Sequence, residues 1–472
     1  MTTISTTPAR QFGGWLKYGA VILATIVVCW AIVIWFWHTT GRNPGTGELA
    51  LALLVLPATL LLGVWGGRKL FAATAALAVA APSKSASSPA AAGIATAAPA
   101  LAIVATALRS PYGASAEELA DAIADNEARA DLDKELVDEH GFPVMAARCE
   151  DAQDEALQDE ITEWLSGQEF SAPHLDEEQW RALILASGVA AELASRAADE
   201  LMPAEGAPPV LQLRLLLPQD WDGAVRLATA KWLTHVVSQY GWPVDKIAVP
   251  DLLEQAQPLT PTALLTQLVP ATPAPPVPLL AVVIACASLI GQESVDRLAA
   301  RSLLFTSSSQ VRGQTPGEGA AGILLADLGQ AQLLGHEDFT LLGPLGERRL
   351  DTSADDARRS DATVLLELAE QLGKAGAIDL SQISMVVADT GHRSNRVLEL
   401  MGLGALAIPQ VDASDDIVRI GLGSGSCGAV PFITVLALAQ HYARERNAPV
   451  LCVSNEDPFL RAAALVCPMA LA

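Results

Sequence analysis

The sequence predicts a mixed α/β domain whose sheet is covered by helices on both faces, preceded by two membrane-spanning helices. From residue 101 onward, apolar strand-like runs alternate with segments whose apolar residues recur every three or four positions, as in amphipathic helices. The strand-like runs are apolar at almost every position, which is typical of strands buried on both faces. Before residue 101 lie two long runs without a charged side chain.

These two uncharged runs are Tyr18–Trp37 and Leu49–Trp65. Each is about long enough to cross a ~30 Å hydrocarbon core, and the tryptophans near their ends suit the membrane interface. A secretory signal peptide is the alternative for the first run. That run is longer than the apolar core of a signal peptide, and no small-residue cleavage site precedes the second run. We therefore expect residues 1–70 to form a two-helix anchor in a lipid bilayer.

Basic side chains indicate the orientation of this anchor. They lie before the first run and after the second, whereas the loop between the runs carries only Arg42. The flanking basic residues are Arg10, Lys17, Arg68, Lys69 and Lys84. Lys and Arg are enriched on the cytoplasmic side of membrane proteins. We therefore expect both ends of the chain in the cytoplasm and the protein in the bacterial inner (cytoplasmic) membrane. The six cysteines form no CxxC pair, which fits a reducing compartment.

Composition limits the class of partner. The net charge is −23, which argues against nucleic acid because binding to phosphates needs a basic face. A solvated acidic surface is a simpler interpretation of this charge than a specific cationic partner. Residues 71–100 are rich in Ala, Ser and Pro and lack large apolar side chains, so we expect a linker there.

The first part of the α/β region contains three expected strands, and a helix or a helical stretch follows each of the first two along the chain. Ser115 is a suitable N-cap for the first helix. The expected elements are a strand at 101–108, a turn at 109–113, a helix from 115, helices over 151–203, a strand at 210–217, a helix at 222–241 and a strand at 279–286.

The second part continues the alternation to the end of the chain. The expected strands are 319–328, 338–346, 383–389, 416–423 and 449–455, and the expected helices are 360–376, 395–402, 429–446 and 459–465.

A Gly-rich turn, GLGSGSCG at 421–428, matches the GxGxxG pattern of dinucleotide-binding folds through Gly423, Gly425 and Gly428. The turn lies about 45 residues from the end of the sequence, and Glu456 is late for the acidic residue that binds the ribose. We favour a turn whose glycines let a helix pack closely against a strand. No cofactor is therefore expected.

Metal and hydrolase motifs are missing. His336, Glu337 and Asp338 are adjacent rather than helically spaced, and no HxxxH, CxxC or GxSxG occurs. We expect no metal site.

One stretch resembles a known family. TPGEGAAGILLADL (315–328) joins a Pro-Gly-Glu-Gly-Ala turn to an apolar strand and resembles the GEGA element of the β-ketoacyl synthases in the thiolase superfamily. Other segments resemble that family in the same order: 103–123, 132–148, 384–400, 420–439 and 450–466. The resemblance spans about residues 101–472. It implies a five-layered α/β/α/β/α domain built from two similar halves, 101–335 and 336–472.

The resemblance also implies where a nucleophile would lie. In the family, a cysteine at a helix N-terminus well before the GEGA element attacks the acyl group. Cys286 begins a family-like Cys-Ala-Ser, but it lies only 31 residues before Gly317, where the family has a later strand. Around residues 220–233, where we expect the nucleophile, no cysteine occurs. We therefore interpret Cys286 as structural.

The family's other catalytic groups are replaced as well. Asp389 stands where the family has its first histidine, with His392 three residues later. The lysine and histidine before the Gly-rich turn are replaced by IGLGSGS, and the closing turn with its histidine by SNEDPF. Condensation needs a thiolate and donors that stabilise the thioester oxyanion. We therefore expect that the protein is not an enzyme.

The resemblance implies a membrane-anchored, non-catalytic binding or scaffold protein with protein partners. It also implies a homodimer, through a strand near 210–217 or 279–286. Degenerate proteins of this kind are associated with bacterial secretion systems such as type VI.

Two other functions stay open. One is an acyltransferase that uses Cys286 or Cys427 with His392. The other is a protein that binds acyl chains or an acyl carrier in a remnant pocket. If the ancestral pocket persists, we expect Asp389, His392, Gly425 and Cys427 to lie near one another.

Overall fold

The computed structural model describes residues 101–168, 173–203, 206–250, 259–269, 277–333, 339–356 and 360–469. The predicted membrane anchor and linker lie outside these residues. Among the described helices, none combines the length and the hydropathy needed to cross a bilayer.

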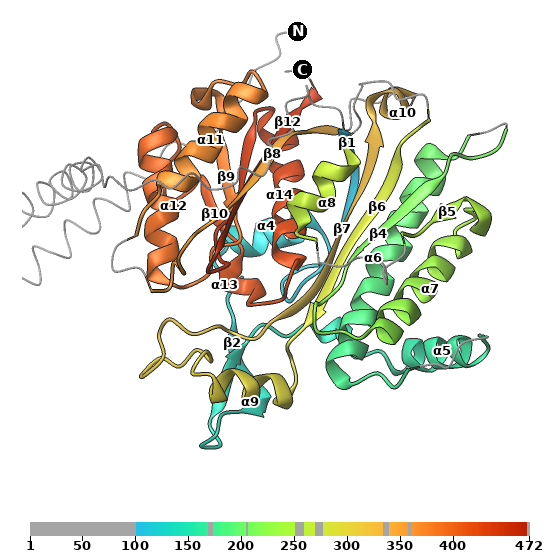
Figure 1. Ribbon diagram of the computed structural model, residues 1–472, viewed down its shortest axis with the longest axis horizontal. Coiled ribbons are helices and arrows are strands. Elements are labelled where there is room, and N and C mark those ends of the chain that lie inside the picture. The colour runs from blue at the N-terminus through green and yellow to red at the C-terminus, as the bar shows by residue number, and fades with distance from the viewer. Residues whose placement is uncertain are drawn as a thin grey trace, which may run out of the picture. The chain divides into compact units, whose positions relative to one another are not determined.

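Ten strands form the main sheet, and the same arrangement of five strands occurs twice in it (Figure 1). In each set, three parallel strands are followed by two strands that run antiparallel to their neighbours. The first set, in spatial order, is β5 (Ile247–Ala248), β4 (Leu211–Leu216), β6 (Leu280–Ser288), β7 (Glu318–Asp327) and β1 (Leu101–Arg109). The second is β10 (Ile417–Arg419), β9 (Met385–Ala388), β11 (Val450–Ser454), β12 (Leu460–Pro468) and β8 (Thr340–Arg349).

The two sets are joined where β1 meets β8. Only Leu101–Ile103 of β1 pair with Thr340–Leu342 of β8. The resemblance implies a five-layered domain with two β layers, and in the described residues this short antiparallel contact joins the two sets of strands into one continuous sheet. Each set nevertheless repeats the order of the other, so we refer to them as the first and second half.

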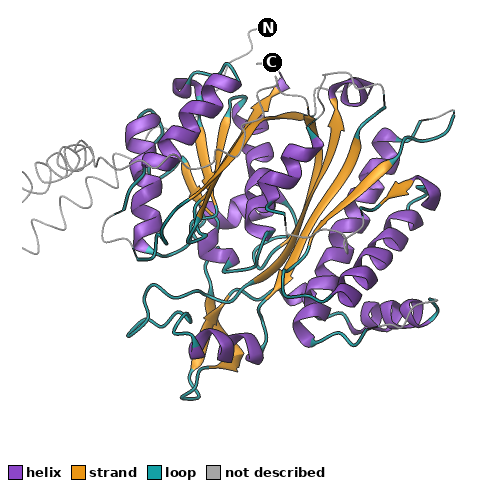
Figure 2. Ribbon diagram, in the orientation of Figure 1, coloured by secondary structure: helices purple, strands orange, loops and turns teal. Residues whose placement is uncertain are grey.

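Helices cover both outer faces and fill the space between the halves (Figure 2). α14 (Val430–Arg446) packs against strands of both halves, including β7 and β11. The outer helices of the first half are α5 (Glu155–Ser166), α6 (Glu177–Leu201) and α7 (Gly223–Gln239), and those of the second half are α11 (Thr363–Ala375) and α12 (Ser394–Ala407). The remaining α-helices described are α4 (Ala116–Ala124), α8 (Pro261–Leu268), α9 (Gln292–Ala300), α10 (Leu328–Leu333) and α13 (Gly421–Ser424), and β2 (Asp131–Val137) pairs with β3 (Pro143–Ala146) in a separate hairpin.

Alternation along the strands divides the core into two layers. On β6, Val282, Ile284 and Cys286 belong to the cluster that contains residues of α6 and α7. Val283 and Ala285 belong to the cluster that contains α14. Because successive side chains of a strand point to opposite faces, Cys286 faces the outer helices and not the space between the halves.

The segment 459–465 is a strand and not the expected helix. Its Ala and Leu residues favour a helix in isolation, but β12 lies between β11 and β8 with both neighbours hydrogen-bonded to it. Its side chains are buried almost throughout, and its small residues let α11 and α14 pack on its two faces. Tertiary packing has overridden the local preference.

The predicted dimer strands are paired to different extents. β6 pairs with β7 along its length and with β4 from Leu280 to Ala285, whereas β4 pairs with β5 only at Leu211 and Gln212. Among the described strands, β5 and β10 are the edges.

Candidate functional site

A cavity of about 840 Å³ lies between the halves, where β4, β6, β9 and β11 end. Such positions, outside the carboxyl ends of parallel strands, are where open α/β sheets bind ligands. Its walls come from the loops after these strands and from the N-terminal ends of four helices, α6, α8, α9 and α14. Segments in its lining are 176–179, 215–221, 259–262, 287–289, 291–293, 425–429, 431–432 and 456–458.

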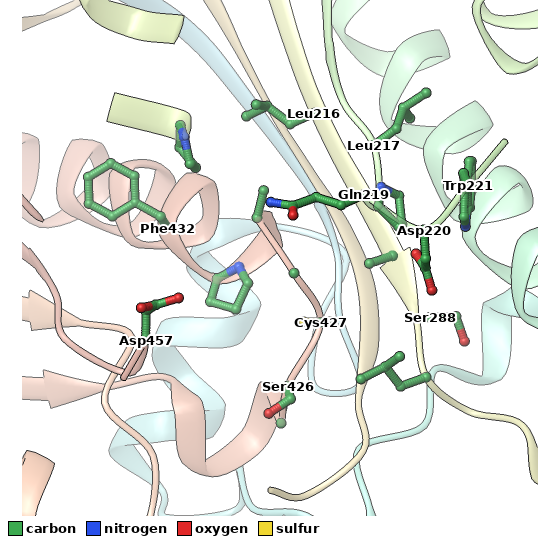
Figure 3. A pocket seen from close by; sticks show the side chains of 18 of the residues that line it. Leu216, Leu217, Gln219, Asp220, Trp221, Ser288, Ser426, Cys427, Phe432 and Asp457 are labelled. Atoms are coloured by element: carbon green, nitrogen blue, oxygen red, sulfur yellow. The ribbon is translucent and has the colours of Figure 1, made fainter. Parts of the chain in front are cut away.

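Figure 3 shows side chains of both halves around this cavity. Asp220, Trp221 and Ser288 come from the first half, and Phe432 and Asp457 lie on the opposite side, in the second half. Gln219 extends from the β4–α7 loop into the space between the two sides (Figure 3). The cavity is thus bounded by both halves.

The cavity contains some of the residues named from the sequence and excludes others. Asp389, Gly425 and Cys427 line it, from the end of β9 and the turn before α14. His392 and Cys286 do not line it.

Neither of the two candidate thiols is poised to react. Cys286 and Cys427 are each 1% exposed, and burial raises the pKa of both to about 12. Cys427 Sγ donates to the carbonyl oxygen of Ser424 at 3.6 Å. Because the thiolate and not the thiol is the nucleophile, this burial disfavours attack by either group on an acyl carbonyl near neutral pH.

Asp389 is the most perturbed carboxyl group of the site. Burial raises its pKa to about 6, although the Ser454 hydroxyl and two backbone N–H groups donate to it and oppose this shift. The N–H groups are those of Asn455, at 2.8 Å, and Glu456, at 3.2 Å. The nearby Glu456 carboxylate raises the pKa further. No cation among the described residues pairs with Asp389.

His392 does not line the cavity and contacts the loop after α9. Its ring stacks edge-on against Phe305, with ring centroids 4.4 Å apart, and burial lowers its pKa. Its Nε2 atom is buried and has no hydrogen-bond partner among the described residues. The sequence predicted that His392 and Asp389 share a pocket, and the structure places only Asp389 in its lining.

Arginine–carboxylate pairs hold the loops that follow β9 and β11 in place. Arg393 Nε donates to Glu456 at 2.8 Å, and Arg396 contacts Asp355 at 2.7 Å. Deeper, Arg461 Nε donates to Glu399 at 2.6 Å. These residues were not foreseen from the sequence, since nothing in the spacing of isolated arginines identifies their partners.

Glu318, the glutamate of the GEGA element, has a structural role here. Arg181 of α6 donates to both of its oxygens, at 2.8 and 2.5 Å. The Ser288 hydroxyl and the backbone N–H of Cys149 complete its contacts. The carboxylate thereby ties α6 to β6 and β7. In the sequence, the signal for this role was a single glutamate at the start of an apolar strand.

The sequence placed the expected position of a nucleophile around residues 220–233, and the structure moves this position. Residues 223–239 form α7, which packs against α6 on the outer face. In the first half, the helix that follows the edge strand and precedes the next parallel strand is α8, as α14 is in the second half. Its N-cap is Thr260, whose hydroxyl accepts from Ala263 N–H and donates to Glu347 Oε2 at 2.5 Å. This helix end therefore carries no thiol either.

The Gly-rich turn before α14 brings backbones into contact. Gly425 has φ +58°, and a Cβ atom there would lie 2.8 Å from the carbonyl oxygen of Thr315. A Cβ atom on Gly317 would lie 2.0 Å from the carbonyl oxygen of Ser424. This geometry agrees with a packing role for the glycines.

The described residues hold no group of three His, Cys, Asp or Glu side chains placed to bind a metal ion.

No protein-family model matches the sequence, and no curated protein matches it. Solved ketosynthase structures are similar to it in fold. One is the ketosynthase from module 6 of the bacillaene synthase from Bacillus subtilis 168, with 14% identity, 78% of this chain and 71% of that chain covered, and a TM-score of 0.53. Another is a chain of a type II PKS acyl-carrier protein in complex with its ketosynthase, bound to the hexaketide. It has 10% identity, 79% and 100% coverage, and a TM-score of 0.53. The described part of this chain therefore has the thiolase-like fold of the ketosynthases.

Proposed function

We propose that this protein is a membrane-anchored, ketosynthase-like binding protein that has lost catalysis. One observation carries the proposal. The cavity between the halves persists, but the thiol in its lining, Cys427, is fully buried with a pKa raised to about 12. A binding surface is thus retained without the activated nucleophile that acyl transfer requires.

The membrane anchor is part of this proposal and rests on the two uncharged runs of the sequence, Tyr18–Trp37 and Leu49–Trp65. A role beside a bacterial secretion system stays a prediction of the sequence.

The second candidate function is binding of an acyl chain or an acyl carrier. It is favoured by the apolar residues of the cavity, including Leu216, Leu264 and Phe432, all of them buried. A ketosynthase of similar fold is known in complex with an acyl-carrier protein.

Loss of catalysis is tested by incubating the full chain with an acyl thioester of N-acetylcysteamine and measuring its intact mass. We expect no acyl adduct, because no described thiol is ionised near neutral pH. An adduct that maps to Cys427 would overturn the proposal in favour of an acyltransferase.

Binding in the cavity is tested by filling it. Gln219 is exposed and extends into the cavity, so Gln219→Trp should occupy the space without disturbing the core. Asp159→Trp, on the exposed face of α5, is the matched control. Partners captured from native membranes by the wild type and the control should be lost with Gln219→Trp. Equal capture by all three would place binding on another surface.

A further inference from the structure

The cavity is lined by more negative than positive side chains. Eight carboxylate residues contribute to its walls, against three arginines. The carboxylates are Asp176, Glu177, Glu178, Asp220, Glu293, Asp389, Glu456 and Asp457, and the arginines are Arg226, Arg297 and Arg393.

The three arginines are already engaged within the protein. Arg393 is paired with Glu456 and Asp355. Arg297 donates to Ser294 and lies 3.9 Å from Glu178. Arg226 donates to the backbone carbonyl groups of Trp221 and Pro218. An anionic ligand would therefore meet few available donors.

Carboxylates on both sides of the cavity lack a cation. Asp220, from the first half, is exposed and has no ion pair among the described residues. Asp457, across the cavity in the second half, accepts only the backbone N–H groups of Phe459 and Leu460 (Figure 3). Glu177 and Glu293 are likewise exposed and unpaired within the described part of the chain.

Apolar side chains also line the cavity on both sides. Phe432 and Leu264 are 4% and 5% exposed, and Trp221 is 8% exposed. A volume of about 840 Å³ lies at the upper end of the range for ligand cavities, enough for a short peptide stretch. Its walls thus combine exposed carboxylates with apolar side chains.

We propose that this cavity binds a basic, partly apolar segment of a partner protein. Lysine or arginine side chains would contact Asp220 and Asp457 on the two sides, and an apolar side chain between them would pack against Phe432. The inference rests on the proposed function, since it assigns a ligand class to the same cavity. It disfavours a phosphate-bearing acyl carrier, which would bring like charge to the rim.

The test uses the full chain in nanodiscs of zwitterionic lipid, with empty nanodiscs as the blank. Binding of fluorescein-labelled Leu-Lys-Leu-Lys-Leu-Lys and Leu-Glu-Leu-Glu-Leu-Glu is measured by anisotropy at about 0.15 M salt, where distant surface charges are largely screened. We expect the lysine peptide to bind at least about tenfold more tightly, because charge complementarity sets specificity.

Two double variants separate the cavity from the overall negative charge. Asp220→Asn with Asp457→Asn should weaken binding of the lysine peptide about threefold to tenfold, the range for two rim contacts. Asp159→Asn with Glu160→Gln removes as much charge from the exposed surface of α5 and should change binding little. Equal losses for both variants would overturn the inference, since binding would then follow net charge alone.

Two further outcomes distinguish this inference from the proposed function. Preferential binding of the glutamate peptide, abolished by Gln219→Trp, would overturn the basic ligand and leave the cavity as a binding site. Binding of the lysine peptide that Gln219→Trp leaves unchanged would overturn the cavity as the site.

Discussion

Each half of the sheet holds one buried carboxylate near the cavity, and the halves accommodate it differently. In the first half, Glu318 is held by the guanidinium of Arg181. In the second, Asp389 is held by a hydroxyl and two backbone N–H groups, with a second carboxylate nearby. Burial opposes ionisation of a carboxyl group unless a cation or donors compensate. The guanidinium of Arg181 therefore compensates the charge of Glu318, whereas Asp389 has no such cation and titrates near pH 6.

The inner helices differ in a parallel way. α14 runs from Val430 to Arg446 and is buried along most of its length between both halves. α8, in the same place of the first half, spans only Pro261–Leu268. The second half therefore supplies most of the inner layer.

The largest expected effect comes from Arg181→Met. Glu318 would be left buried without its cation, and breaking such a pair costs about 3–5 kcal/mol of unfolding free energy. Urea denaturation of the variant measures this loss. Adding Glu318→Gln should recover part of it, because the neutral amide no longer needs a cation. An Arg181→Met variant as stable as the wild type would show that Glu318 does not need the charge of Arg181.

The next largest effect is expected when the same substitution is made in each of the two inner helices. Leu436→Ala in α14 should lower the unfolding free energy by about 3 kcal/mol, and Leu265→Ala in α8 by less, although both side chains are 0% exposed. The rigid surroundings of α14, packed by strands of both halves, cannot collapse into the space that is created. Denaturant midpoints of the two variants provide the comparison, and equal losses would contradict a special role of α14.

A pH-dependent gain of comparable size is expected from Asp389→Asn. Because the folded pKa of about 6 is above the unfolded value of 3.8, the stability from protonated Asp389 is present below about pH 4 and is lost as the pH rises through 6. The neutral variant should thus be more stable than the wild type at pH 8, by about 3 kcal/mol. It should differ little at pH 4. Unfolding curves at both pH values test this, and a loss of stability at pH 8 would exclude the raised pKa.

The smallest expected effect is in thiol labelling. The five cysteines of the described residues are all buried, so a Cys29→Ser variant should take up almost no iodoacetamide while folded. In urea the same variant should label at all five positions. Rapid labelling of Cys427 in the folded protein would restore the enzyme hypothesis for the second half.

The alternation of apolar strands and helices, and the GEGA-containing segment that becomes the start of β7, were accessible from the sequence because burial on both faces leaves a local pattern. Gly425 and Asp389 were also accessible as residues that end or follow strands. The pairing of Arg181 with Glu318 was not, since the two residues are 137 positions apart and no local pattern links them.

The sequence by itself determined the α/β class and the order of most elements, because these depend on residue type and local periodicity. Only the tertiary structure decided that 460–468 is a strand, that Cys286 faces the outer helices while Cys427 lines the cavity, and that α8 and not α7 is the inner helix. The physical reason is that the face on which a side chain lies, and the cavity it borders, depend on register and packing between distant segments. Local sequence does not specify those contacts.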